Sequence, residues 1–225
     1  MKEKLLIVTC TRAKTNEEFA RRPIYQSLKK QYEINSNISF YVFKDNQRGL
    51  SDCYNEILSD SSNADKVVLF VHDDLVLEDL FLYEKLMQSP YSITGLAGTK
   101  TFDKRAEKLA WHLAAENKNS FVGEVGHYAQ QHGVWTTQFG PTNSRALIVD
   151  GLFIACKIND IVAKQLQFDT NFGFHFYDIA FCLRANEKKV TCGVLPIRVI
   201  HHGLGDSMLT QEWEAANQKF KQLYP

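Results

Sequence analysis

The feature that most constrains the fold is a run of five apolar residues, 67–71, which ends directly at His72, Asp73 and Asp74. A strand with one face in water alternates apolar and polar residues, whereas this run has no polar position. It is therefore typical of a central strand that other elements cover on both faces. The three polar residues predict that this strand ends in a loop at the surface.

Short strands and helices alternate along most of the chain. Strands are predicted at residues 5–8, 38–43, 92–97, 145–157 and 190–200, and helices at 21–32, 51–58, 78–88, 103–116, 160–166, 177–186 and 210–223. Residues 99–144 interrupt the alternation and, beyond the helix at 103–116, follow neither pattern. Alternation of this kind implies right-handed crossover connections and a mostly parallel sheet between helical layers. We predict an α/β three-layer sandwich in which residues 1–225 form a single domain.

Composition excludes several classes of protein. The chain has 225 residues, 44% of them hydrophobic, which suits one globular domain with its own core. Its 26 basic and 26 acidic residues leave no positive excess for a nucleic-acid partner. No stretch approaches the ~20 apolar residues that span a bilayer, and residues 5–10 are too short for a signal peptide. We predict a cytoplasmic protein without a transmembrane segment, and the sequence leaves its oligomeric state undecided.

The cysteines and the common nucleotide-binding motifs exclude further classes. Five cysteines, an odd number without a C-x-x-C pair, are typical of reduced thiols rather than of a disulfide framework. The sequence contains neither G-x-G-x-x-G nor G-x-x-x-x-G-K-[ST], which argues against a dinucleotide oxidoreductase and a P-loop NTPase.

Four polar clusters follow predicted strands: residues 9–12, 45–46, 72–74 and 201–202. Ligands of open α/β sheets bind at the carboxyl ends of the strands, so these clusters are the candidate site. Asp73 and Asp74 repel each other in a partly dry site, and a hard divalent cation would relieve that repulsion and carry diphosphate oxygens as well. An aspartate that only caps the following turn explains the same residues equally well.

Two later clusters could complete such a site. His201 and His202 lie on a predicted strand, so their rings point to opposite faces and at most one of them faces the crevice. That ring could bind the metal or a phosphate, although either histidine taken alone fits a core position better. Asp178 opens a helix after an aromatic loop at 168–176, where the helix dipole favours its ionised form. It could take a proton from a sugar hydroxyl, or it could simply cap the helix.

Six segments in this order resemble a known family. They are residues 8–12, 49–55, 71–74, 149–154, 174–178 and 199–202. Together they are similar to GT-A-fold, Rossmann-like glycosyltransferases of the family-2-like branch named for the StrF protein of streptomycin biosynthesis. The resemblance covers most of the chain except residues 99–144. It implies a nucleotide-binding half at 1–98, an acceptor-binding half at 99–225, and inverting, metal-dependent transfer from a nucleotide sugar to a carbohydrate or other hydroxyl acceptor.

The resemblance also implies a role for individual residues. Asp178 corresponds to the catalytic base, and Asp74, with His201 or His202, to the ligands of Mn²⁺ or Mg²⁺. The residues that correspond to the nucleotide pocket are Thr9, Thr11, Arg12, Asp45, Asn46, Asn55 and Asp73. Those that correspond to the donor and acceptor sugar site are Asp150, Gly151, His175 and Tyr177. A hexosyltransferase of polysaccharide or natural-product biosynthesis would fit this family.

One position departs from the family pattern. His72 stands where many GT-A enzymes have an aspartate, and an imidazole cannot reproduce the hydrogen bonds that a carboxylate makes to sugar hydroxyls. A binding module of the same fold that has lost catalysis is therefore one alternative. A sugar nucleotidyltransferase is a weaker one, because residues 9–14 lack the glycine-rich phosphate loop that such enzymes normally need.

Overall fold

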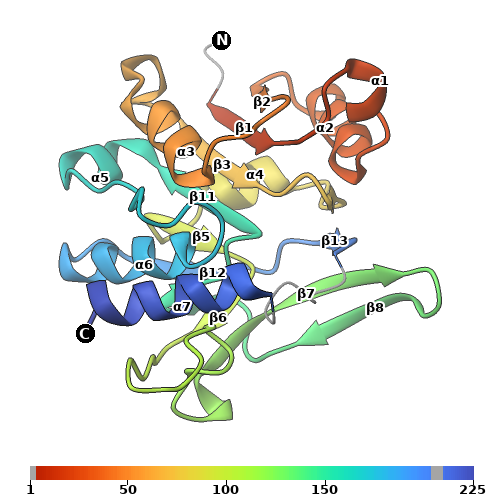
Figure 1. Ribbon diagram of the computed structural model, residues 1–225. Coiled ribbons are helices and arrows are strands. Elements are labelled where there is room, and N and C mark those ends of the chain that lie inside the picture. Colours follow the sequence, from red (N-terminus) through yellow and green to blue (C-terminus); the bar gives the residue numbers. More distant parts are fainter. Residues whose placement is uncertain (1–3, 204–209) are drawn as a thin grey trace.

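The run at 67–71 forms strand β3 inside a seven-stranded sheet. The computed structural model describes residues 4–203 and 210–225 (Figure 1). The strand order is β2-β1-β3-β11-β5-β12-β9. The bounds are β1 (Leu5–Cys10), β2 (Ile38–Phe43), β3 (Val67–Val71), β5 (Ile93–Gly95), β9 (Ser144–Arg145), β11 (Phe153–Lys157) and β12 (Cys192–Val194). All five positions of β3 are buried, as the sequence predicts.

This sheet is mixed, so the prediction of a mostly parallel sheet is wrong. Strands β1–β2, β1–β3 and β5–β12 pair in parallel, whereas β3–β11, β5–β11 and β9–β12 pair antiparallel. A strand covered on both faces reads as an apolar run whichever way it points, so burial alone carries no information on direction. The architecture is nevertheless mixed α/β and consistent with a GT-A-like fold.

A second sheet lies beside the first and carries a long hairpin. Its order is β10-β6-β7-β13-β4, and β8 pairs with β7 outside that path. The bounds are β4 (Leu75–Leu77), β6 (Ala97–Thr99), β7 (Phe121–Ala129), β8 (Gly133–Gln138), β10 (Ile148–Val149) and β13 (Val199–His201). The β7–β8 hairpin projects from the body of the molecule (Figure 1). The hairpin lies in the stretch 99–144, and its second strand shows no apolar–polar alternation because β8 is exposed at nearly every position.

The helices lie against the strands. Their bounds are α1 (Asn16–Phe19), α2 (Pro23–Ile34), α3 (Leu50–Ser59), α4 (Leu82–Met87), α5 (Ile158–Ala163), α6 (Tyr177–Glu187) and α7 (Gln211–Leu223), with 3₁₀ turns η1 (Ser61–Asn63) and η2 (Lys118–Ser120). Figure 1 shows α3, α5, α6 and α7 in front of the sheet and α4 behind it. No helix among residues 4–203 and 210–225 is long and apolar enough to cross a membrane.

The helix predicted at residues 103–116 is absent, and turns and bends replace it. Tertiary partners take over the backbone groups that a helix would use. The Leu109 amide donates to Asn217 Oδ1 on α7 at 3.1 Å, and Asn217 Nδ2 donates to the Glu107 carbonyl at 3.0 Å. Asn217 is completely buried, so these bonds pin the segment onto α7.

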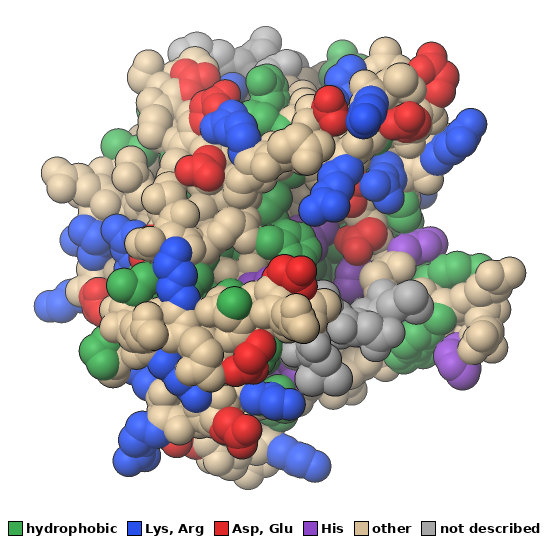
Figure 2. Space-filling model, in the orientation of Figure 1, with side chains coloured by type: hydrophobic (Ala, Val, Ile, Leu, Met, Phe, Trp, Pro, Cys, Tyr) green, Lys and Arg blue, Asp and Glu red, His purple; other side chains and the backbone are tan. Residues whose placement is uncertain are grey.

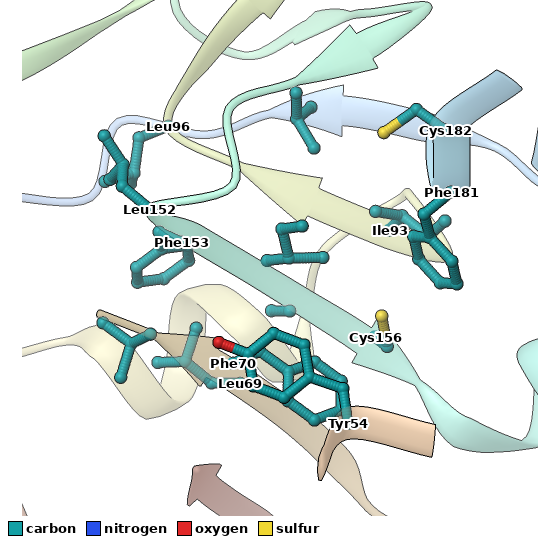
Figure 3. Packing of buried hydrophobic residues seen from close by; sticks show 14 of the residues in the cluster. Tyr54, Leu69, Phe70, Ile93, Leu96, Leu152, Phe153, Cys156, Phe181 and Cys182 are labelled. Carbon is teal, nitrogen blue, oxygen red and sulfur yellow. The ribbon is translucent and has the colours of Figure 1, made fainter. Parts of the chain in front are cut away.

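The core continues from the first strands into the later helices. Figure 3 shows Tyr54 from α3 against Phe70 from β3, with Phe181 from α6 further along the sheet, past β11. The rings of Tyr54 and Phe70 stack at 4.3 Å between centroids. The ring of Phe168 stacks on Phe181 at 3.9 Å and meets Phe70 edge-on at 5.6 Å. One aromatic cluster therefore joins strands and helices from both halves of the chain.

Helix α7 holds the aromatic loop at 168–176 in place. Phe220 is fully buried, and its ring contacts Phe172 and Phe176 with centroids 5.4 and 5.2 Å away. Phe176 adopts a left-handed backbone with φ of 65°, which is unfavourable for a bulky side chain and persists only where the surroundings enforce it. The packing of α7 thus fixes the residue that precedes Tyr177 and Asp178.

We expect Phe220→Ala to lower the free energy of unfolding by ~3–5 kcal/mol, because it leaves a cavity inside this cluster. Chemical denaturation with urea measures the change. Leu223→Ala is the matched control, because the Leu223 side chain is on the same helix and 49% exposed. Equal effects of the two substitutions would show that α7 is not anchored through Phe220.

Candidate functional site

A pocket opens where β1, β2 and β3 end. Its volume is about 410 Å³. The lining residues are Cys10, Thr11, Arg12, Arg22, Asn46, Gln47, Arg48, Gly49, Leu50, Asp73, Gly173 and Phe174. Four of the residues predicted for a nucleotide pocket meet here: Thr11, Arg12, Asn46 and Asp73. They converge because parallel neighbouring strands bring their carboxyl ends to one edge of the sheet.

Asp73 faces this pocket, and two of the pocket's own residues hold its carboxylate. Asp73 Oδ2 accepts a 2.6 Å hydrogen bond from Thr11 Oγ1 and lies 3.1 Å from Arg22 Nε. Arg22 precedes α2, so the start of that helix supplies a cation at the pocket wall. A carboxylate held in this way can accept hydrogen bonds from ligand hydroxyls on its remaining lone pairs.

Three residues predicted for this pocket do not line it. Thr9 is completely buried, and its hydroxyl has no hydrogen-bond partner. Asp45 is exposed in the loop after β2. Asn55 bonds to the backbone of Phe168, donating to the carbonyl at 2.9 Å and accepting from the amide at 2.8 Å. Asn55 therefore anchors the aromatic loop to α3.

The sequence did not point to Arg22, Gln47 or Arg48, which also line the pocket together with Phe174 of the predicted aromatic loop. Phe174 comes from the loop that follows Phe172, which α3 holds: Ser51 Oγ donates to the Phe172 carbonyl at 2.6 Å. The loop lies so close to the start of α3 that a Cβ on Gly49 would be only 2.8 Å from Gly173 Cα. The two glycines are the only sequence signal for this contact, and glycine has many other uses.

Next to the pocket, Asp74 pairs with a histidine. Its Oδ2 lies 3.3 Å from His201 Nε2, while Oδ1 is buried without a partner. Although burial opposes it, the hydrogen bond from His201 and the neighbouring histidines lower the pKa of Asp74. Burial also opposes the charged form of His201, but the hydrogen bond to Asp74 outweighs burial and raises the pKa of His201. A side chain at residue 203 would collide with the His201 ring, so the close approach of Gly203 to the Asp74–His201 pair requires a glycine.

Of the two adjacent histidines, only His201 faces Asp74. The His202 side chain is exposed and its ring lies 4.9 Å from Tyr128, on the opposite face of β13. This is the alternation expected of consecutive strand residues. Within residues 4–203 and 210–225, no three His, Cys, Asp or Glu side chains form a metal-binding group.

Asp74 and His201 nevertheless fit a cation that brings other ligands with it. Mg²⁺ and similar ions are commonly held by one or two protein groups, with water and substrate phosphates filling the remaining positions. The unpartnered, buried Oδ1 of Asp74 is the observation in favour, because a buried carboxylate oxygen without a donor is costly unless a ligand completes it.

Asp178 lies at the start of α6 and reaches back to the segment before β11. Its Oδ2 accepts a 2.9 Å hydrogen bond from the Gly151 amide. A side chain at Gly151 would collide with Tyr177 and crowd Asp178, so the glycine permits this approach. Burial, together with the charge of Asp150, raises the pKa of Asp178 to about 7. A carboxyl group with this pKa can both accept and release a proton near neutral pH.

Asp150 connects the two parts of the site. Its carboxylate accepts from Trp111 Nε1 at 2.7 Å and from the Leu152 amide at 3.0 Å. Its charge contributes to the raised pKa values of both Asp178 and His201. The charge of Asp150 thus acts on both Asp178 and His201. Trp111 lies in the segment where the sequence predicts a helix that is absent, so its contact with Asp150 could not be foreseen.

His72 points inward rather than into the pocket. Its Nε2 is 2.9 Å from Tyr177 Oη, and the Tyr177 hydroxyl donates to the Gly151 carbonyl at 2.7 Å. Because that hydroxyl uses its only proton on Gly151, His72 donates from Nε2, and burial lowers its pKa. His175 is half-buried, with its ring 5.0 Å from Phe174. Tyr177 and His72 thus orient Gly151 beneath Asp178.

The raised pKa of Asp178 predicts a pH-dependent stability change in Asp178→Asn. The unfolded-state pKa is ~3.9, so folding binds a proton between that pH and about 7, and the wild type loses stability across this range. The amide has no charge to bury, so the melting temperature of the variant relative to wild type should rise from pH 4 to pH 8. Asp160→Asn, in the first turn of α5 and exposed, is the control. A pH-independent difference would contradict the raised pKa.

With this geometry established, the class of protein can be stated. The model of a glycosyltransferase-like family matches residues 12–224, which is nearly the whole chain. The chain belongs to this glycosyltransferase-like family, which indicates sugar transfer in general. No curated protein matches the chain.

Proposed function

We propose that the protein transfers a sugar from a nucleotide-diphosphate donor to a hydroxyl group of an acceptor, in a metal-dependent reaction that inverts the anomeric centre. The observation that carries the proposal is the Asp178 carboxylate at the start of α6, which the Gly151 amide holds at 2.9 Å and whose pKa burial raises to about 7. The charge of Asp150 acts on this group and on His201 of the Asp74–His201 pair. The same site would thus contain a proton acceptor and a place for the diphosphate charge.

The pocket beside β1–β3 suits the nucleoside of the donor. Its volume and its mixture of arginines, amides and the Phe174 ring match a group that is aromatic at one end and polar at the other. Asp73 can accept from ribose hydroxyls, and Arg12, Arg22 and Arg48 offer cations for phosphate oxygens. Because Asp73 and Asp74 are adjacent, a donor that runs past Asp73 brings its diphosphate to Asp74.

Asp74 and His201 would hold Mn²⁺ or Mg²⁺ on this diphosphate. When bound, such an ion neutralises the negative charge that develops on the leaving group. His201 would bind the ion through a neutral ring nitrogen, so the ion would displace the proton that His201 shares with Asp74. His202 faces the opposite side of the strand and has no part in this proposal.

Asp178 would act as the general base. Its carboxylate takes the proton of the acceptor hydroxyl while the hydroxyl oxygen forms a bond to the anomeric carbon and the bond to the diphosphate breaks. The Gly151 amide fixes one oxygen of Asp178, and His72 with Tyr177 fixes Gly151. His72 therefore supports the catalytic base, and Asp73 would make the carboxylate contact with the nucleotide that His72 cannot make. This division of roles favours an enzyme over the binding module that His72 suggests.

Binding of nucleoside diphosphates to the whole chain tests the proposal. We would measure the melting temperature with UDP, GDP, CDP and dTDP, each with Mn²⁺ and with EDTA, and then the slow hydrolysis of the corresponding nucleotide sugars. Stabilisation by one diphosphate that requires Mn²⁺, with hydrolysis of its sugar, is the expected result. Binding without any hydrolysis would favour the binding module. Absence of both would contradict the proposed donor.

The motifs also favour a particular place within the family. We infer a hexosyltransferase of the StrF-type branch that acts in polysaccharide or natural-product biosynthesis. Purified polysaccharide fragments and small-molecule aglycones, offered with the donor found above, separate these two kinds of acceptor.

A further inference from the structure

A row of three rings crosses the second sheet and ends at the candidate site. Trp135 on β8 pairs in register with His127 on β7, and His127 pairs with His201 on β13. Residues directly opposite each other on neighbouring strands point to the same face of a sheet. The Trp135 and His127 rings are stacked, with centroids 5.3 Å apart and planes at 22°, and the His127 and His201 centroids are 5.9 Å apart.

The row extends from Asp74 away from the nucleotide pocket. Asp73 turns to Thr11 and Arg22 at the pocket, whereas Asp74 turns to His201, where the row begins. The row therefore adjoins Asp74 on the side away from the nucleotide pocket. Figure 2 shows histidine side chains beside acidic ones where the hairpin meets the body.

Trp135 at the far end of this row is open to solvent. Its side chain is 42% exposed, whereas Trp111 and Trp213 are 6% and 5% exposed. One face of this indole is stacked on the His127 ring and the His132 ring lies edge-on at 6.2 Å, so the other indole face is the flat apolar surface that a ligand can use. The C–H face of a sugar ring matches such a surface, because it can pack on the ring while its hydroxyls remain hydrated.

We propose that Trp135 and His127 form a platform for a sugar residue of the acceptor. This inference rests on the proposed function, because the acceptor must approach from the side that the nucleotide does not occupy. Continuity of the row with Asp74 and His201 favours a saccharide over a second protein, whose contact would not need to run into the site. The chemical class of the acceptor is then a glycoside rather than a sugar-free alcohol.

Tryptophan fluorescence of the intact chain tests the platform directly. The two buried tryptophans are shielded from acrylamide, so the quenchable signal belongs to Trp135. We would titrate methyl glycosides of glucose, galactose, mannose, rhamnose and N-acetylglucosamine to ~100 mM, which detects even millimolar dissociation constants. At least one glycoside should protect Trp135 from quenching. No protection by any of the five would overturn the proposal.

Matched variants separate the platform from the hairpin as a whole. Trp135→Ala should weaken binding of the protecting glycoside about tenfold or more, measured by saturation-transfer NMR, and Trp135→Phe should restore part of it. Val134→Ala changes the neighbouring, 59% exposed residue on the other face of the hairpin and should bind as wild type does. Wild-type affinity in a folded Trp135→Ala would overturn the proposal.

The nucleoside diphosphate assay on the same preparation keeps the two ideas distinct. Mn²⁺-dependent stabilisation by a diphosphate without protection of Trp135 would remove the platform and leave the proposed function standing. Protection of Trp135 without diphosphate binding would leave a saccharide site and remove the proposed donor.

Discussion

Asp178→Asn should lower the rate of sugar transfer by ~10²–10⁴, the usual contribution of a general base, while nucleoside diphosphate binding stays within about twofold of wild type. The amide can still accept the hydrogen bond from the Gly151 amide, so the local structure is kept, but it cannot take a proton from the acceptor. Steady-state release of the diphosphate in the presence of acceptor measures the rate, and calorimetry measures binding.

The pH profile provides an independent check on this assignment. Because burial and Asp150 raise the pKa of Asp178 to about 7, the fraction of ionised base grows through neutral pH, and kcat/KM should rise up to about that pH. Asp160→Asn is again the control, since its carboxylate is exposed and follows the end of β11 that pairs with the start of β3, whereas the pocket lies where β3 ends. Substantial transfer by Asp178→Asn would identify another group as the base.

Asp74→Ala should lower transfer by ~10²–10³ and abolish the dependence of diphosphate binding on Mn²⁺. Removing the carboxylate takes away both the buried Oδ1 and the partner of His201, so the cation loses the one anionic ligand that the site supplies. Calorimetric titration of the diphosphate with Mn²⁺ and with EDTA reports the change. The wild type should show a large difference between the two conditions, and the variant should show none.

Two further variants test whether the loss of Mn²⁺-dependent binding is specific to the Asp74 carboxylate. Asp65→Ala removes an exposed carboxylate from a distant turn and should behave as wild type. His201→Gln removes the neutral imidazole ligand and leaves the Asp74 carboxylate, so it should weaken Mn²⁺-dependent binding less than Asp74→Ala does. Binding that remains Mn²⁺-dependent in Asp74→Ala would place the cation elsewhere.

The N-terminal strands could be predicted because each is a run of mostly apolar, aromatic or β-branched residues. The runs at 5–8, 38–43 and 67–71 all lie in observed strands, although only Ile38 of β2 is buried. The direction of β11 could not be predicted, because an apolar run looks the same in either orientation. The helix expected at 103–116 failed for another reason: Asn217, far along the chain, offers that backbone better partners than the helix would.

The candidate site divides in the same way. Thr11, Asn46 and Asp73 converge because they lie in the loops that follow neighbouring parallel strands. Their meeting can be predicted once the strands are recognised in the sequence. Trp111 and Trp135 come from the irregular stretch and the hairpin, and their positions depend on tertiary packing that no spacing in the sequence records. The same holds for the choice of His201 over His202, which required the register of β13 against β7 and β4.

The position of β11 between β3 and β5 also matters while the protein is being made. Residues 4–98 supply β1, β2, β3 and β5, yet β3 and β5 are joined only through β11 at Phe153–Lys157. A nascent chain released from the ribosome up to residue 98 would therefore leave one edge of β3 and both edges of β5 unpaired. We expect such chains to depend on a chaperone until Lys157 has emerged, and the isolated N-terminal fragment to aggregate.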